Sequence, residues 1–254
     1  MASMSSYEAK KPIIDTILAN HRTENLDRIV DALSDSDGSI LALEAAGKTK
    51  AERACIERAL NAFLAGNPCQ EDMEFLIEIG DGLFDRVATR FEGTGKKLYL
   101  VDASCEDRVF RYIHRSDQQF DSLETLINRD ADIDLLRHVM RCLVVVDARA
   151  VALRDRLVAR QVRQIMQIYP GEKITLFQGA LHSRVSHELA RTASVSRLFV
   201  PSLAEETTYH PQVKMSYEGY NHALRQQLFL GSIADDVIDE SLLQFMLLYE
   251  QIRP

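Results

Sequence analysis

The sequence predicts a single α/β domain whose central sheet is flanked by long helices on both faces. Two observations carry this prediction. Short apolar runs such as residues 39–44 and 96–102 are hydrophobic at most positions, as strands buried on both faces are. Long segments with apolar residues at helical spacing alternate with these runs, and such alternation is typical of a sheet covered by helices. With 254 residues, 46% of them hydrophobic, the chain can bury this core without disulfides or metals.

The first strand–helix alternation is expected within the first 64 residues. Residues 12–19 are short and β-branched at several positions, so a strand and a first helical turn are both open. Apolar residues at helical spacing predict a helix over 23–33, and the turn cluster 34–38 ends it. Residues 39–44 are apolar nearly throughout and predict a buried strand. Residues 49–64 have one apolar side and predict a helix.

The middle of the chain is expected to contain one strand between helices. A single helix is predicted over about 70–91. Residues 96–102 are the clearest strand, with a basic approach, four apolar residues and then a carboxylate. Residues 120–128 and 132–166 have helical patterns. Within the second of these, residues 142–146 favour a strand by propensity, but no Gly or Pro separates them from their flanks, so a helix is favoured there.

The last third of the chain completes the alternation. The expected elements are a strand at 173–177, a loop at 178–182, a helix at 185–192, strands at 197–201 and 212–217, and a helix at 235–252. The last helix starts with acidic residues, which suit the helix dipole. Its apolar face is wider than one stripe, which predicts deep burial or an oligomer contact. Since no linker or repeat is visible, residues 12–254 are expected to form one domain after a flexible segment, residues 1–11.

Composition excludes several classes of protein. A net charge of −8 disfavours a nucleic-acid partner. No run of about eighteen apolar residues predicts a membrane span, and the first twelve residues lack the apolar core of a secretory signal. The four cysteines match no zinc-site spacing, and reduced thiols indicate a cytoplasmic protein. Motifs for phosphate loops, dinucleotides, zinc proteases and serine hydrolases are not found in the sequence.

Polar residues at three predicted strand ends are the candidate site. Ligands of helix-covered sheets bind outside the carboxyl ends of the strands, where Glu44, Asp102 and the segment from Gly179 to His182 are expected. Gly179 allows the backbone to turn sharply toward a ligand, and His182 suits proton transfer or metal or haem ligation. The structural alternatives are a histidine that packs at a strand end and carboxylates that face solvent.

Three further residues depend on neighbouring elements. His21 lies near a strand end if residues 12–19 form a strand, and in an exposed loop if they form a helix. Arg154 and Arg160 belong to an arginine-rich helix that either binds an anion or faces solvent. Cys105 is a poor nucleophile candidate, because its acidic neighbours disfavour a thiolate.

Three segments resemble a known superfamily. They are an apolar run into His21 followed by a helix, an apolar strand that ends at Glu44, and an arginine-rich helix followed by a strand into Gly179-Ala-Leu-His182. Their order is similar to that in the superfamily of TraB/Tiki-type proteins, ChaN-like haem-binding proteins and erythromycin esterases, over residues 13–190. The resemblance implies that Glu44, His182 and His21 face one crevice with Arg154 or Arg160. In hydrolytic relatives such groups act on a water or bind a divalent metal.

The first functional hypothesis is therefore a hydrolase of a small-molecule or peptide substrate. His182 and His21 would be base or ligand, Glu44 their carboxylate partner, and Arg154, Arg160, Asp102 and Gly179 would bind substrate. The cofactor is open between a divalent metal, haem and none.

Two other classes stay open. The family usually has Gly before its first His, whereas this chain has Leu18-Ala-Asn20. That difference favours a non-catalytic binding module, either haem-binding-like or a bacterial effector or toxin-associated domain secreted without a classical signal. The third hypothesis is a scaffold that dimerises through residues 235–252.

Overall fold

The computed structural model describes residues 11–19, 25–79, 82–129, 131–180, 182–200 and 211–252, with the backbone alone at 183, 211–219 and 248–252. The chain folds into two compact units. The first comprises Met1–Asp102 and Leu157–Pro201, and the second comprises Ala103–Arg156 and Ser202–Pro254. The long helix α6 (Ile133–Ile168) contributes residues to both.

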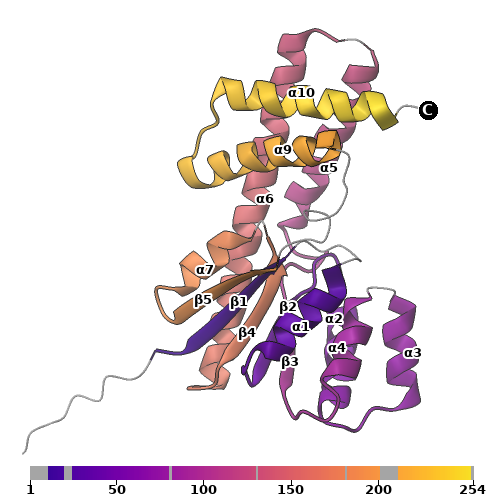
Figure 1. Ribbon diagram of the computed structural model, residues 1–254, viewed down its shortest axis with the longest axis vertical. Helices are drawn as coiled ribbons and strands as arrows, with labels where there is room; N and C mark the ends of the chain where they lie inside the picture. Colours follow the sequence, from indigo (N-terminus) through magenta and orange to yellow (C-terminus); the bar gives the residue numbers. More distant parts are fainter. Residues whose placement is uncertain are drawn as a thin grey trace, which may run out of the picture. The chain divides into compact units, whose positions relative to one another are not determined.

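The first unit contains a five-stranded parallel sheet in the order β3-β2-β4-β1-β5 (Figure 1). The strands are β1 (Ile13–Ala19), β2 (Ile40–Glu44), β3 (Lys97–Val101), β4 (Ile174–Gly179) and β5 (Ser194–Val200). Residues 12–19, where strand and helix were both open, thus supply a strand next to β4. Parallel neighbours cannot be joined by tight hairpins, so helices connect them.

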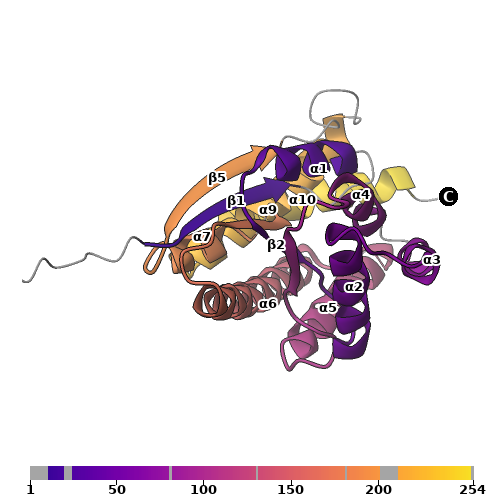
Figure 2. The same cartoon turned by 90° about the horizontal axis from the view of Figure 1, so that it is seen from below.

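Helices cover both faces of this sheet (Figure 2). One face packs against α1 (Leu26–Asp35), α2 (Lys50–Leu64) and α4 (Leu83–Arg90), and its cluster includes Ile17, Ile29, Leu43, Leu60, Phe84 and Phe177. The other face packs against the last part of α6 and against α7 (Ser183–Leu189), and its cluster includes Ile14, Val158, Val162, Ile174, Leu176 and Val185. The predicted α/β class, with a sheet flanked by helices, is confirmed.

The start of α2 follows from its sequence. The Thr49 hydroxyl accepts the Glu52 backbone N–H at 3.1 Å, and the Glu52 carboxylate accepts the Thr49 backbone N–H at 2.6 Å. This reciprocal pair satisfies two of the amide groups that a helix N-terminus leaves without a partner. The predicted helix boundary at residue 49 is confirmed.

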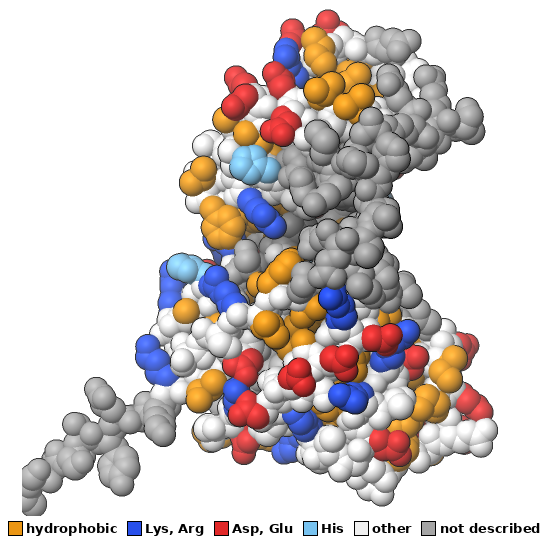
Figure 3. Space-filling model, in the orientation of Figure 1, with side chains coloured by type: hydrophobic (Ala, Val, Ile, Leu, Met, Phe, Trp, Pro, Cys, Tyr) orange, Lys and Arg blue, Asp and Glu red, His pale blue; other side chains and the backbone are white. Residues whose placement is uncertain are grey.

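Ion pairs on the surface of the first unit join α1 to α4. Arg86 contacts Asp27 at 2.8 Å, and Arg90 contacts Asp31 at 3.5 Å. All four side chains are at least one-third exposed, so each pair contributes at most about 1 kcal/mol. On the face drawn in Figure 3, acidic and basic side chains lie interspersed over this unit.

The second unit is built from helices. They are α5 (Phe110–Asn128), the first part of α6, α9 (Pro211–Leu230) and α10 (Asp235–Ile252). The rings of Phe120 and Phe245 meet edge to face at 5.2 Å and join α5 to α10. The Tyr220 hydroxyl donates to Asp147 at 2.8 Å and joins α9 to α6. Burial raises the pKa of Tyr220, and the neighbouring Asp147 carboxylate raises it further.

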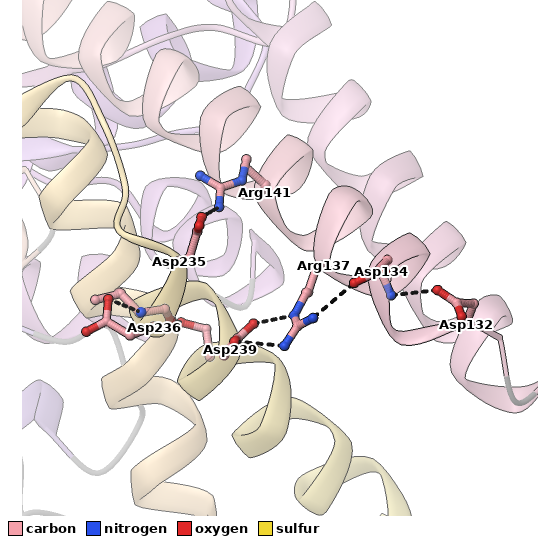
Figure 4. Close-up of polar contacts among 9 residues, drawn as sticks. Asp132, Asp134, Arg137, Arg141, Asp235, Asp236 and Asp239 are labelled. Carbon is pink, nitrogen blue, oxygen red and sulfur yellow. Dashed lines mark hydrogen bonds and ion pairs between the residues drawn. The ribbon is translucent and has the colours of Figure 1, made fainter.

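Arginines of α6 hold the acidic start of α10 (Figure 4). Arg137 binds both carboxylate oxygens of Asp239, at 2.6 and 2.9 Å, and also contacts Asp134 at 3.0 Å. Arg141 binds the Asp235 carboxylate and donates to the Ile233 carbonyl at 3.1 Å. The acidic residues that were expected to suit the helix dipole thus also have cationic partners.

The wide apolar face of α10 is only partly buried. Val237, Ile238 and Leu242 lie in the interior, while Leu243 and Leu247 are 60% and 39% exposed. The oligomer contact proposed for this helix stays a prediction. Among the helices within the described residues, α10 included, none combines the length and hydrophobicity needed to cross a membrane.

Three predicted elements need correction. The single helix expected over 70–91 is two helices, α3 (Gln70–Ile79) and α4, because Gly82 adopts a positive φ of 64° that ends helical geometry before Leu83. The strand expected at 212–217 is wrong, since these residues belong to α9. A short alternation of apolar and polar residues does not outweigh a helix of 20 residues. The loop expected at 178–182 begins later, because β4 runs through Gly179.

Residues 142–146 are helical, as favoured. They lie within α6, which continues through them without a break, and Leu143 and Val144 are buried. The helical context of α6 and the burial of Val144 outweigh the preference of the three valines for strands.

Candidate functional site

The site is built on the adjacent carboxyl ends of β2 and β4. Leu43 pairs with Phe177 in the register of the two strands, so the next residues, Glu44 and Gln178, lie side by side at the sheet end. Gly179 ends β4, and its backbone N–H donates to the Glu44 carboxylate. The strand order therefore brings one predicted acid next to the predicted glycine.

A tight turn returns His182 to the same place. The His182 backbone N–H donates to the Gly179 carbonyl at 2.9 Å, and α7 begins directly after His182. The buried Gln178 side chain donates to the His182 carbonyl at 2.7 Å, which ties the turn to the strand. The same carbonyl accepts the Val185 N–H at 3.2 Å, in the first turn of α7.

The Glu44 carboxylate and the His182 imidazole form a buried pair. Glu44 Oε1 and His182 Nε2 are 3.4 Å apart, and the two side chains are 9% and 7% exposed. One carboxylate oxygen thus faces the imidazole while the other accepts the Gly179 N–H. A buried carboxylate requires such partners, because an isolated buried charge is costly. The arrangement fixes the imidazole relative to the strand ends.

Asp102 lies one residue past β3, whose last residue Val101 pairs with Glu44 on β2. Asp102 is fully buried and has a positive φ of 119°, a strained conformation for a residue other than glycine. Its backbone is held from two sides. Gln161 accepts its N–H at 2.7 Å and donates to its carbonyl at 3.1 Å, and Arg53 donates to the same carbonyl at 2.6 Å. Such strain is found at functional sites more often than elsewhere.

The remaining predicted residues have different positions. Arg160 belongs to the first unit and is exposed on α6, and no ion pair of its guanidinium is found among the described residues. Arg154 belongs to the part of α6 in the second unit. His21 lies outside the described residues. The roles assigned to these three residues stay predictions.

Three buried polar side chains on β1, β4 and α7 were not predicted as site residues. Within the described part of the chain, Gln178 Oε1, Thr16 Oγ1 and Ser186 Oγ have no hydrogen-bond partner, and all three residues are at most 1% exposed. By strand alternation, Thr16 and Gln178 share the face of the sheet on which α7 packs. The available signal for both residues was a polar side chain within a largely apolar strand.

The described residues do not bring together a set of metal ligands. Among them, no three His, Cys, Asp or Glu side chains lie close enough to hold a metal ion. His182 Nε2 faces a carboxylate rather than an open coordination position, so it does not fit an axial haem ligand through that nitrogen. The four cysteines are free thiols, and Cys105 is exposed.

Comparison with family models, with curated proteins and with solved structures gives no match to this chain. The resemblance to the TraB, ChaN and erythromycin-esterase superfamily therefore stays a prediction.

Proposed function

We propose that the chain is a hydrolase in which the Glu44–His182 pair activates a water. The observation that carries this proposal is the buried contact, at 3.4 Å, between a carboxylate and an imidazole at the carboxyl ends of two central parallel strands. Ligands of such sheets bind at these strand ends. Imidazole transfers protons near neutral pH, and a carboxylate partner holds it in one orientation.

The chemistry of the pair follows from which atoms already face each other. His182 Nε2 faces Glu44 Oε1. The His182 imidazole would be the general base. It would accept a proton from the attacking water and return it to the leaving group. Glu44 would balance the charge of the imidazolium, while the Gly179 N–H keeps the carboxylate in place. Since both side chains are more than nine-tenths buried, the proposal favours a small-molecule substrate.

The same burial also supports a second candidate, a non-catalytic module. In that case the pair links the start of α7 to the end of β2 and stabilises the sheet, while binding of a ligand or partner occurs elsewhere. Leu18-Ala-Asn20, in place of the glycine expected before His21, is in keeping with a lost reaction. The two candidates differ in whether the pair affects turnover or only stability.

The test compares His182→Gln and Glu44→Gln with His187→Gln, which replaces an exposed histidine on α7, the helix that follows His182. The purified chain is assayed with a panel of p-nitrophenyl esters and short peptides. For the hydrolase, both pair variants lower kcat/KM about 100-fold or more, and His187→Gln leaves it unchanged. Far-UV circular dichroism and thermal unfolding are measured on each variant to separate lost chemistry from lost structure.

Two results would contradict the hydrolase proposal. If folded His182→Gln keeps full activity, the pair is not the catalytic centre. If the unaltered chain hydrolyses no member of the panel while the pair variants lower Tm, the non-catalytic module is the better reading of the site.

A further inference from the structure

The two edge strands of the sheet in the first unit, β3 and β5, differ in whether side chains of the first unit bind their outward backbone groups. At the β3 edge, the polar side chains of Arg53, Glu57 and Asn61 follow each other at successive turns of α2. Asn61 accepts the Leu98 N–H at 2.9 Å and donates to the Leu98 carbonyl at 2.8 Å. These are the two bonds that a neighbouring strand would make with that residue.

Side chains of α2 also take the place of a neighbouring strand farther along the β3 edge. The Glu57 carboxylate accepts the Leu100 N–H at 2.5 Å, and Arg53 donates to the carbonyls of Leu100 and Asp102. Burial raises the pKa of Glu57, and the Leu100 N–H and Arg53 oppose that rise. Helix α2 therefore occupies the backbone groups of β3 that would otherwise pair with another strand, and this edge is closed.

The β5 edge has no comparable cover among the described residues. Within them, β5 pairs with β1 on one side and with no strand on the other. It is seven residues long, and two of its apolar side chains, Leu198 and Phe199, are 51% and 49% exposed. An edge strand of this length with exposed apolar side chains is a template for pairing with a further strand.

We propose that β5 pairs antiparallel with β5 of a second copy of this chain, across a two-fold axis at Leu198. In this register Leu198 faces Leu198 of the partner, Arg197 faces Phe199, and Ser196 faces Val200. Alternation places Arg197 and Phe199 on one face of the sheet and Leu198 on the other. Each exposed Leu198 thereby gains the partner's Leu198 as an apolar neighbour, and each Arg197 guanidinium lies beside the ring of the partner's Phe199.

Self-complementarity selects this register and this occupant. In an antiparallel pair, the side chains of two opposite residues lie on the same face of the sheet. A two-fold axis perpendicular to the sheet therefore runs midway between two copies of one residue, which face each other. An axis at Arg197 would oppose two guanidinium groups, which repel each other. An axis at Ser196 would leave Phe199 beyond the paired residues, and an axis at Phe199 would leave Arg197 and Ser196 opposite residues past the end of β5. The axis at Leu198 avoids all three, and the resulting pairing continues one sheet through two copies.

Sedimentation velocity of the full chain from micromolar to sub-millimolar concentration tests the proposal. The expected result is a concentration-dependent monomer–dimer equilibrium. Phe199→Lys places a cation opposite Arg197 of the partner, while Phe199→Glu removes the same ring but places an anion there. We expect Phe199→Lys to weaken the dimer about 10-fold or more and Phe199→Glu to retain it. The control is Leu243→Lys on α10, which should leave the equilibrium unchanged.

A cross-link tests the two-fold position directly. In a chain whose four cysteines are replaced by serine, Leu198→Cys places two thiols opposite each other, where the strand spacing allows a disulfide. Ile13→Cys, a half-exposed position on β1, is the matched control. Oxidation should give a covalent dimer of the first variant and not of the second.

Two outcomes would overturn the proposal. One is a chain that stays monomeric at every concentration and whose Leu198→Cys variant forms no cross-link. The other is a dimer that Leu243→Lys dissociates and Phe199→Lys does not, which would assign the interface to α10. Circular dichroism of each variant confirms that the half-exposed substitutions leave the fold intact.

Discussion

At the scale of single residues, two threonines of adjacent central strands show how differently a buried hydroxyl can be accommodated. Thr16 on β1 and Thr175 on β4 are both fully buried. The Thr175 hydroxyl shares a 2.5 Å hydrogen bond with the Ser36 hydroxyl, whereas Thr16 Oγ1 has no partner among the described residues. A buried polar group without a partner costs about 1–3 kcal/mol, while a satisfied one contributes modestly to stability.

Replacing each threonine by valine should therefore have opposite effects. We expect Thr16→Val to leave the free energy of unfolding unchanged or raise it by about 1 kcal/mol, since it removes an unsatisfied hydroxyl at equal volume. Thr175→Val should lower it by about 1 kcal/mol, because the Ser36 hydroxyl loses its bond to Thr175 and keeps only the longer one to Asp15, at 3.3 Å. Urea unfolding of both variants measures the difference. Destabilisation by Thr16→Val would show that its hydroxyl is satisfied in solution.

At the scale of elements, side chains of helix α2 bind the outward backbone groups of strand β3. A parallel strand at the edge of a sheet has backbone groups directed outward, and a helix cannot normally pair with them. Here the helical spacing of Arg53, Glu57 and Asn61 matches the alternate residues of the strand, so three side chains replace a strand. The helix thus positions β3, and with it the strained Asp102 at the strand end.

Among these contacts, Asn61 binds both the N–H and the carbonyl of one residue, Leu98. Asn61→Ala leaves both Leu98 groups without that partner, and we expect a loss of about 2–3 kcal/mol in the free energy of unfolding. Asn67→Ala is the control, because Asn67 is exposed and its side chain makes one long bond of 3.4 Å. Urea unfolding should separate the two variants clearly. Equal, small losses for both would mean that solvent satisfies Leu98 as well as Asn61 does.

At the scale of the whole molecule, a cluster of polar contacts holds β1 to its neighbours, and we expect part of the stability of the chain in acid to depend on it. Asp15 on β1 contacts Lys173 at 2.7 Å and accepts a hydrogen bond from Ser196 of β5 at 2.5 Å. Burial by itself raises the pKa of Asp15, but the hydrogen bonds from Lys173 and Ser196 outweigh it, so the net pKa lies below the usual value of 3.8. Because the folded pKa is depressed, the stabilisation is present above pH 3.8 and is lost as pH falls through the folded value.

The free energy of unfolding should therefore decline as the pH falls below about 4, and Asp15→Asn should remove part of that decline. The variant should be less stable than the unaltered chain at pH 7 and closer to it at pH 3. Asp117→Asn, at an exposed position on α5, is the control and should follow the unaltered chain. The measurement is urea unfolding between pH 2.5 and 7, and parallel curves for Asp15→Asn and the unaltered chain would contradict the prediction.

Local sequence determined the class of the fold and the ends of most strands. Strand and helix signals act over a few residues, so the runs ending at Glu44 and near Gly179 were visible without any structure. The exceptions have local causes as well. Residues 212–217 alternate like a strand but are short, and the break at Gly82 depends on one backbone angle within an otherwise helical pattern.

Only the tertiary structure decided which strand ends meet. The order of parallel strands depends on long-range packing, and no local pattern specifies that β2 lies beside β4. That adjacency places Glu44 3.4 Å from His182 and gives Gly179 its bond to the same carboxylate. The same strand order leaves β5 at an edge of the sheet. The sequence thus determined the polar residues at the strand ends, whereas the strand order decided that two of them form a pair.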